Sequence, residues 1–155
     1  MPEVSLEQSE RIINSILARG RELKCRPLAI AVTDIGAHVK AFKREDSSAM
    51  MRFEMAMGKA FAALALRRSS SLVRARNEEK PAFMSYLINA SGGKIFPEGG
   101  GRLIRDAQGE VIGAVGVTGD TEMQDEELAA HGIRAAGLKT DEDCAHLGHQ
   151  VRLKN

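Results

Sequence analysis

The sequence of 155 residues is poor in aromatic residues and cysteine, with no tryptophan, one tyrosine and two cysteines. So few aromatic rings supply little for stacking on nucleic-acid bases or sugars. Cys25 and Cys144 are too few for a disulfide framework and suit a reducing cytoplasm. No apolar run reaches the roughly 18 residues that a membrane-spanning helix needs. We therefore expect a cytoplasmic protein with no membrane partner.

An excess of charge of either sign is also missing. The chain has 22 basic and 21 acidic residues, which leaves a net charge of +1. This balance argues against nucleic acid or an anionic membrane as the main partner. The acidic, polar N-terminus does not resemble a signal peptide. The one basic cluster, Arg67, Arg68, Arg74 and Arg76, is interpreted as a solvated helix edge.

The first half of the chain shows helix and strand patterns in turn. A capping box at Ser5 and Gln8 opens a helix predicted over about 5–24. Strands predicted at 28–33 and 38–43 form a hairpin around the turn at 34–37. A second helix is predicted over about 48–67, with Asp46, Ser47 and Ser48 as its cap. It is apolar nearly all round, so we expect it to be largely buried or to lie at a subunit contact.

The second half is expected to contain a second hairpin and the last clear helix. Three serines at 69–71 end the second helix and leave at most one further turn at 72–76, followed by a short segment at 82–89. Strands are predicted at 102–104 and 111–118, then a helix from Thr121 to Gly137 with a second capping box at Gln124. The polar tail, 138–155, has room for a short helix. One domain over 1–155 is expected, with an α+β fold in which an antiparallel sheet lies between helices.

A glycine-dense loop, Gly99-Gly100-Gly101, precedes the third predicted strand. Three consecutive glycines indicate either positive φ or the close approach of another group to the backbone. Close approach of a ligand would make this loop the rim of a pocket. The glycines match no phosphate-binding motif, and they precede a strand where a dinucleotide fingerprint would open a helix.

Two charged residues are candidates for chemistry. Lys59 lies in an apolar stretch, so it either extends its amine to the helix edge or forms a cation on a pocket floor that meets a ligand carboxylate.

Thr118, Gly119 and Asp120 precede the last predicted helix, where they either cap it or present N–H groups to an anion. Asp125, in the first turns of that helix, is able to fold back toward the glycine loop.

The four histidines give no convincing metal motif. His146 and His149 follow Cys144 in a C-x-H-x-x-H pattern on the polar tail, and His131 lies in the last predicted helix. No second cluster of ligands accompanies the tail pattern. We expect no metal site of protein ligands alone.

Two segments of the sequence together resemble one family. They are PLAIAVTDIGAHVKAFKREDSS with the helix that carries Lys59, and FPEGGGRLIRDAQGEVIGAVGVTGDTEMQDEELAAHG. Over about 27–137 the chain is similar to the GlcG/HbpS-like family, also called the heme-degrading-domain or PduO C-terminal-like family. The resemblance implies a profilin-like α/β/α sandwich with a five-stranded antiparallel sheet. It also implies homo-oligomers, from dimers to octamers, that bind a small ligand, which in some members is heme.

The resemblance also implies site residues. The pocket pattern of the family maps onto Lys59, Phe96, Pro97, Gly100, Gly101, Gly116, Val117, Thr118, Gly119 and Asp125. Some heme-binding members use an N-terminal histidine, but residues 1–37 contain none. His38, which opens the second predicted strand, is the histidine expected near the pocket.

Three functions remain open from the sequence. The favoured one is an oligomeric protein that binds heme or another planar, carboxylate-bearing cofactor. The second is an enzyme acting on a small aromatic or oxidised carboxylate metabolite, with Lys59 or Asp125 as its acid–base group and the glycine loop as a polarising site. The third is a non-catalytic accessory subunit.

Overall fold

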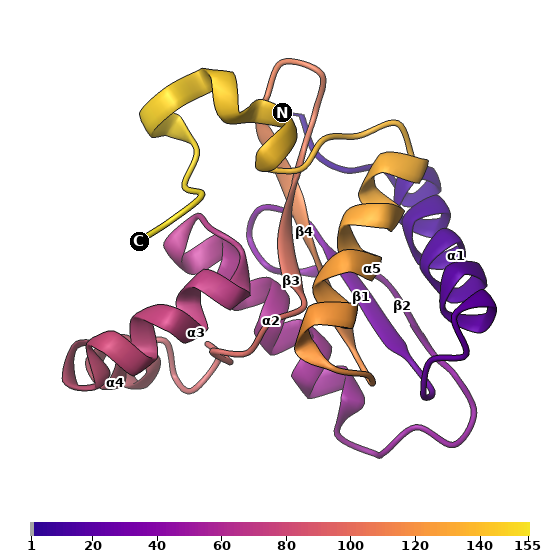
Figure 1. The fold of residues 1–155 in the computed structure, drawn as a ribbon, viewed down its shortest axis with the longest axis horizontal. Coiled ribbons are helices and arrows are strands. Elements are labelled where there is room, and N and C mark those ends of the chain that lie inside the picture. The colour runs from indigo at the N-terminus through magenta and orange to yellow at the C-terminus, as the bar shows by residue number, and fades with distance from the viewer. Residues whose placement is uncertain (1) are drawn as a thin grey trace.

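The computed structural model describes residues 2–155 and forms one antiparallel sheet with helices around it (Figure 1). The elements are α1 (Leu6–Glu22), β1 (Ala29–Thr33), β2 (Val39–Arg44), α2 (Arg52–Leu66), α3 (Ser70–Glu79), α4 (Pro81–Ala90), β3 (Gly101–Arg105), β4 (Val111–Thr118), α5 (Glu122–Ala135) and the 3-10 helix η1 (Glu142–Gln150). Both predicted hairpins and the three main predicted helices are present. Within residues 2–155, no helix is both long and apolar enough to cross a membrane.

The sheet is antiparallel, with the strand order β2-β1-β4-β3. β1 pairs with β2 on one side and with β4 on the other, so Ala29 lies opposite both Arg44 and Thr118. The expectation of five strands was wrong, because residues 2–155 form a sheet of four. The tail contacts the outer edge of β3 with only an isolated bridge, between Lys139 and Arg105, where a fifth strand would pair.

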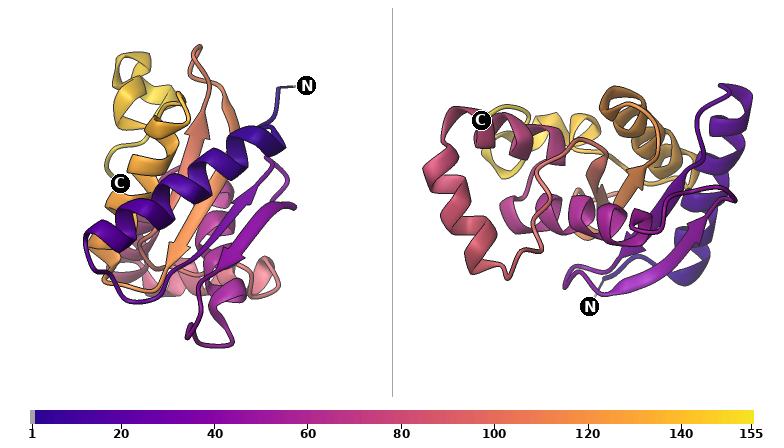
Figure 2. Two further views of the ribbon diagram at one scale, coloured as in Figure 1. Left: turned by 90° about the vertical axis from the view of Figure 1, so that its right-hand side faces the viewer. Right: turned by 90° about the horizontal axis from the view of Figure 1, so that it is seen from below.

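Helices cover both faces of this sheet, which confirms the α+β sandwich. α1 and α5 pack against each other and against one face, while α2 crosses β1, β3 and β4 on the other face (Figure 2). The main core lies between the sheet and the α1–α5 layer. Its largest fully buried side chains include Ile12, Ile13, Ile16, Leu28, Ile30, Ile104, Leu128 and Ile133.

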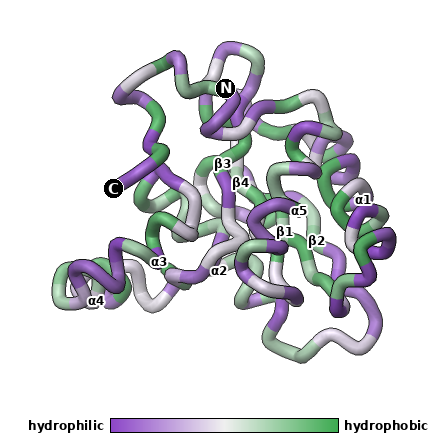
Figure 3. Tube along the Cα trace, viewed as in Figure 1, coloured by the Kyte–Doolittle hydropathy of each residue, from purple (hydrophilic) through white to green (hydrophobic). Residues whose placement is uncertain are grey.

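α1 follows directly from its sequence. The Ser5 hydroxyl accepts a hydrogen bond from the Gln8 N–H at 3.0 Å, and the Gln8 side chain accepts one from the Ser5 N–H at 2.9 Å. This is the predicted capping box. Apolar residues at helical spacing then bury one face against the sheet, and hydrophobic and hydrophilic residues alternate along the helix (Figure 3).

α2 differs from the prediction at its start and in its burial. It begins at Arg52, and Met51 is its N-cap, without a side-chain cap hydrogen bond. The predicted cap at 46–48 fails because Ser47 has a φ of +68°, which turns the chain before the helix starts. The face on the sheet is built from small residues, Ala56, Ala60 and Ala63. The helix is not buried all round, because Phe53 and Glu54 are exposed in its first turn.

The serines at 69–71 were expected to end α2, but α2 ends at Leu66, where the left-handed backbone of Arg67 caps it. The serines instead start the ten-residue helix α3, where one further turn was expected, and the short segment at 82–89 belongs to a second ten-residue helix, α4. Pro81 occupies the first turn of α4, where a missing N–H costs nothing. Val73 and Met84 pack these helices onto Ala62 of α2 and form a second, smaller apolar cluster with Ile95.

The predicted helix after Thr140 is the irregular 3-10 helix η1, which has non-helical backbone at Cys144 and Gly148. Although the tail is polar in sequence, it is anchored in the domain. The Arg105 guanidinium, which is 2% exposed, donates to Asp141 Oδ1 and to the Gly109 carbonyl, both at 2.7 Å.

Candidate functional site

An apolar groove of about 780 Å³ lies between α2, the β1–β2 turn and the segment before β3. Gly36, Ala37 and His38 form the wall from the β1–β2 turn. The other walls contain the residues Met51, Phe53, Glu54, Met55, Met57, Gly58, Phe61, Gly93, Lys94, Ile95 and Phe96. This volume lies in the range of small-molecule sites, which is about 300–1,000 Å³.

Aromatic and thioether side chains give the groove its character. Phe53, Met57 and Phe61 follow one another at intervals of four on α2, so they share one face of the helix. The Phe96 N–H donates to the Gly58 carbonyl at 3.2 Å, which ties the opposite wall to α2. Lys94 lies at the rim, with its ammonium 5.9 Å from the centre of the Phe61 ring. Flat, polarisable surfaces of this kind suit a planar apolar ligand.

His38 contributes the imidazole of the groove. Its side chain is 81% exposed, and its Nδ1 lies 3.2 Å from both carboxylate oxygens of Asp34. Burial works to raise the Asp34 pKa, but hydrogen bonds from the N–H groups of His38 and Gly36 and from the imidazole together lower it. Because the carboxylate engages Nδ1, the Nε2 atom is left to bind a ligand.

Lys59 and Asp125 form a buried ion pair behind the glycine loop. Lys59 Nζ lies 3.3 Å from Asp125 Oδ2 and donates to the Val117 carbonyl at 2.9 Å. The side chains are 4% and 1% exposed. Of the two alternatives for Lys59, the structure shows a buried amine that does not reach the helix edge, and Asp125 returns toward the glycine loop. The partner of the ammonium is a carboxylate of the protein itself.

Burial dominates the electrostatics of this pair. Loss of hydration lowers the pKa of Lys59 and raises the pKa of Asp125, while the attraction between the two charges works in the opposite direction on each. Asp125 Oδ1 also accepts a hydrogen bond from the Asp120 N–H at 3.1 Å. Two charges held inside a protein in this way are strongly coupled to its folding.

The N–H groups of the glycine loop are bound by the protein's own side chains. The Gly99 N–H donates to Glu122 Oε1 at 2.6 Å, and the Gly100 N–H donates to Glu126 Oε1 at 3.2 Å. The Gly101 N–H donates to the Ser70 hydroxyl at 2.7 Å. Successive backbone N–H groups make an anion-binding concavity, and here the first turns of α5 fill it with carboxylates.

Both reasons expected for these glycines apply. Gly100 has a φ of +124°, which favours glycine. A Cβ on Gly101 would collide with the Lys59 carbonyl, and one on Gly116 would collide with the Ala56 carbonyl. The group that approaches the backbone so closely is therefore helix α2, which packs directly on β3 and β4.

The remaining predicted site residues lie around this buried region. The Thr118 hydroxyl accepts a hydrogen bond from the Arg52 guanidinium at 2.8 Å, and the Val117 N–H donates to the Gly100 carbonyl at 2.9 Å. Gly119 has a φ of +139° and lies against the Pro27 carbonyl. Pro97 is half-buried beside Phe96.

The predicted site is therefore divided in two. His38 and Phe96 line the groove. Eight of the others, Lys59, Gly100, Gly101, Gly116, Val117, Thr118, Gly119 and Asp125, lie in the sealed layer between α2, β4 and α5. Among the residues that the structure describes, the groove lining does not include these eight.

Sequence reasoning missed several groove residues. Phe53, Met55, Met57 and Phe61 were assigned to a buried helix or a subunit contact, and Lys94 and Asp34 were not considered. The signal that identifies the first group is the run of large apolar residues on the side of α2 away from its alanines. Asp34 is found from its position four residues before His38 in a tight turn.

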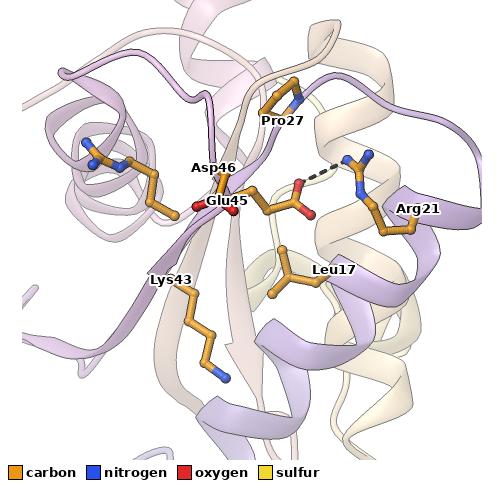
Figure 4. Close-up of a pocket in the computed structure, with 7 residues that line it drawn as sticks. Leu17, Arg21, Pro27, Lys43, Glu45 and Asp46 are labelled. Atoms are coloured by element: carbon orange, nitrogen blue, oxygen red, sulfur yellow. Dashed lines mark hydrogen bonds and ion pairs between the residues drawn. The ribbon is translucent and has the colours of Figure 1, made fainter.

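A second, polar pocket of about 500 Å³ lies between α1 and the end of β2 (Figure 4). Three of its charged groups, those of Arg21, Lys43 and Glu45, pair with one another or with adjacent residues. Arg21 Nη2 lies 2.9 Å from Glu45 Oε1, which also accepts a hydrogen bond from the Leu28 N–H at 2.8 Å. Lys43 Nζ donates to Asn14 Oδ1 at 2.8 Å. These contacts join α1 to the sheet.

No group of three or more His, Cys, Asp and Glu side chains across residues 2–155 has the arrangement of a metal site. In the C-x-H-x-x-H pattern of the tail, Cys144 is buried whereas His146 and His149 are exposed. Burial raises the pKa of the Cys144 thiol, which disfavours the thiolate that binds metals.

Comparison with known proteins identifies the family. Residues 4–134 match the family model described as "Haem degrading protein HbpS-like". The chain belongs to this HbpS-like family. A curated relative, an uncharacterized 15.0 kDa protein of the dhaT-dhaS intergenic region in Citrobacter freundii, is 26% identical over 126 residues, which are 81% of this chain and 87% of the relative.

Solved structures share the fold of this HbpS-like chain. The PduOC:heme complex aligns with a TM-score of 0.79 at 22% identity, over 89% of this chain and 98% of that one. The Klebsiella pneumoniae protein ORFY also gives 0.79 at 22% identity, over 88% and 92%. HbpS gives 0.74 at 21% identity, over 86% and 90%. At these identities the similarity establishes the fold alone.

Proposed function

We propose that this chain binds heme, or another planar cofactor with carboxylate groups, in the apolar groove. One observation carries the proposal. The aromatic and thioether side chains of α2 line the same groove as the imidazole of His38, whose Nδ1 atom is held by Asp34. Imidazole is a common axial ligand of heme iron. The existence of the PduOC:heme complex supports this choice of ligand within the same fold.

The residues of the groove fit such a ligand. Phe53, Phe61 and Phe96 offer apolar surface to a flat ring. Lys94 lies exposed at the rim, where its ammonium can meet a carboxylate at the edge of the ring. This assigns to Lys94 the role expected of Lys59, whose amine already pairs with Asp125. An iron porphyrin in the groove would supply an iron centre, and Nε2 of His38 would be the nitrogen that holds it.

A hemin titration followed in the Soret region tests the proposal. The expected result is a saturable, shifted band at one hemin per chain, which weakens or changes shape in His38→Ala. The matched control is His131→Ala, which removes an exposed histidine of α5 and is expected to leave the band unchanged. A signal that does not saturate in the unaltered protein would refute heme binding.

A metal-free porphyrin tests binding by the groove separately from coordination of the iron by His38. Protoporphyrin IX is expected to bind the protein and His38→Ala with affinities within about twofold, because it has no iron for the imidazole. Lys94→Ala is expected to lower the affinity for porphyrins with free carboxylates by about tenfold and to leave the affinity for their dimethyl esters unchanged. Lys80→Ala, which removes another exposed lysine, is the control.

We also propose that the chain forms a homo-oligomer. Met50, Tyr86 and Met123 are each more than 70% exposed, and Phe83 is half-exposed. Large apolar side chains in such exposed positions support burial against further subunits. Light scattering on purified protein is expected to give a multiple of 16.8 kDa. A mass of a single chain at micromolar concentration would contradict this proposal.

Catalysis by Lys59 and Asp125 has no comparable support. Their charged groups pair with each other inside the domain, and a substrate in the groove would not touch them. The enzyme alternative therefore lacks an exposed acid–base pair at the positions first considered for it. Ligand binding by the groove is the function that the geometry favours.

A further inference from the structure

The β1–β2 turn is organised by the carboxylate of Asp34. Its Oδ1 atom accepts hydrogen bonds from the N–H groups of Gly36 and His38, both at 2.9 Å. Both of its oxygens lie 3.2 Å from His38 Nδ1. The Asp34 N–H donates to the His38 carbonyl at 3.0 Å, which closes the turn. One side chain thus fixes both the backbone and the imidazole of residue 38.

Two further features show how tightly this turn is built. Ala37 has a φ of +65°, a conformation that costs a residue with a Cβ about 1–2 kcal/mol. A Cβ on Gly36 would lie 2.9 Å from His38 Cε1 and 3.0 Å from Nδ1, so the imidazole rests directly on the backbone of Gly36. Strained backbone that the surrounding contacts maintain is often found at ligand sites.

An ordinary hairpin turn in the same chain provides the comparison. Asp106 Oδ1 accepts hydrogen bonds from the N–H groups of Gln108 and Glu110, both at 2.9 Å, in the turn between β3 and β4. The positive φ in that turn falls on Gly109, where it costs little. The first turn therefore adds two features to a shared design: a strained alanine and an imidazole bound to the carboxylate.

We infer that Asp34 is a positioning residue, which holds His38 in the tautomer whose Nε2 atom binds heme iron and strengthens that nitrogen as a donor. The inference rests on the proposed heme binding. With its proton on Nδ1 and shared with the carboxylate, the neutral imidazole carries a free electron pair on Nε2. Coordination then requires no proton to leave. A carboxylate on the second nitrogen raises the basicity of a metal-binding histidine.

The test compares Asp34→Asn with the control Asp106→Asn, with hemin as the probe. Asparagine keeps the oxygen that accepts the two backbone N–H groups but loses the negative charge. Asp34→Asn is expected to weaken hemin binding about 10–100-fold. It is also expected to move the reduction potential of the bound heme to a more positive value, because a weaker donor stabilises the ferric state less. Asp106→Asn is expected to change neither quantity.

Gly36→Ala provides an independent variant that keeps the carboxylate. The added methyl group displaces the imidazole from its resting position, so the Soret band of bound hemin and the hemin affinity are expected to change. This variant replaces Asp34→Asn if that protein fails to fold, as judged by its thermal unfolding.

The outcomes separate the inference from the function on which it rests. Hemin that does not bind the unaltered protein saturably refutes heme binding itself. If hemin binds saturably but gives the same Soret band in His38→Ala, heme binding by the groove stands. The role of His38 as iron ligand is then overturned, and with it the positioning role of Asp34. A band that depends on His38, with an unchanged affinity and potential in Asp34→Asn, overturns the inference alone.

Discussion

Lys59 and Asp125 lie 66 positions apart in the sequence, yet their charged groups approach to 3.3 Å in the interior of the domain. The same ammonium donates to the Val117 carbonyl of β4. One buried cation therefore links α2 to α5 and to the centre of the sheet. The first role of this pair is to hold both helices in register with the glycine loop.

Replacement of Lys59 by alanine is expected to destabilise the protein by about 3–5 kcal/mol, because Asp125 is left as a buried charge without its partner. The control is Arg11→Ala, which breaks an exposed pair with Glu7 and is expected to cost less than about 0.5 kcal/mol. Urea unfolding measures both changes. A folded Lys59→Ala protein of nearly normal stability that had lost hemin binding would instead assign Lys59 to the cofactor.

The close contact of α2 with the sheet gives a second prediction. Gly116→Ala is expected to lower the free energy of unfolding by about 3 kcal/mol or more, because its Cβ collides with the Ala56 carbonyl and neither backbone can yield. Gly93→Ala serves as the control: its φ is +78°, but the position is open, so only about 1 kcal/mol of backbone strain is expected. Equal costs for the two variants in chemical denaturation would show that steric contact is not the cause.

The sequence predicted the sheet and the main helices because their patterns are local. The capping box of Ser5 and Gln8, and the apolar runs of β1 and β4, are read within about ten residues. The start of α2 was harder to predict from the sequence, because the positive φ of Ser47 depends on how the loop returns to the sheet. The full length of α3 and α4 was missed because their cover comes from Ala62 of α2 and from Ile95, contacts that the pattern within each short helix does not reveal.

The sequence indicated His38 and Phe96 of the groove, but it did not separate them from the buried residues behind the glycine loop. Three glycines correctly indicated a close approach to the backbone, but no local pattern distinguishes a ligand from a helix of the same protein. The carboxylates of Glu122 and Glu126 fill the glycine loop only because α5 returns over β3. The groove in turn depends on Phe96 meeting Gly58, a contact between residues 38 positions apart.

The tail is expected to loosen at low pH through Asp143. Burial works to raise its pKa, but hydrogen bonds from Arg134 and Thr140 outweigh this effect and lower it from 3.8 to about 2. Because the folded pKa is depressed, the stabilisation is complete above about pH 4 and is lost as the pH falls toward 2. Asp143→Asn is expected to cost about 1 kcal/mol at pH 6 and almost nothing at pH 2.

Hydrogen exchange of the amides in η1, measured from pH 6 to pH 2.5 and corrected for intrinsic rates, follows this change. Asp46→Asn, at an exposed aspartate after β2, is the control for the loss of a carboxylate outside the tail. A difference between Asp143→Asn and the unaltered protein that stayed constant over this range would show that the charge of Asp143 does not anchor the tail.

Occlusion of the groove tests its role directly. Met57→Trp adds a large ring to the centre of the aromatic and thioether face of α2, where the side chain is only half-buried. Both hemin and protoporphyrin IX are expected to bind at least about tenfold more weakly, while the thermal unfolding temperature changes by no more than a few degrees. Met123→Trp, at a methionine of α5 that is 79% exposed, is expected to leave both affinities unchanged. If Met57→Trp binds both porphyrins normally, the ligand lies outside this groove, and the arrangement of Asp34 and His38 has another purpose.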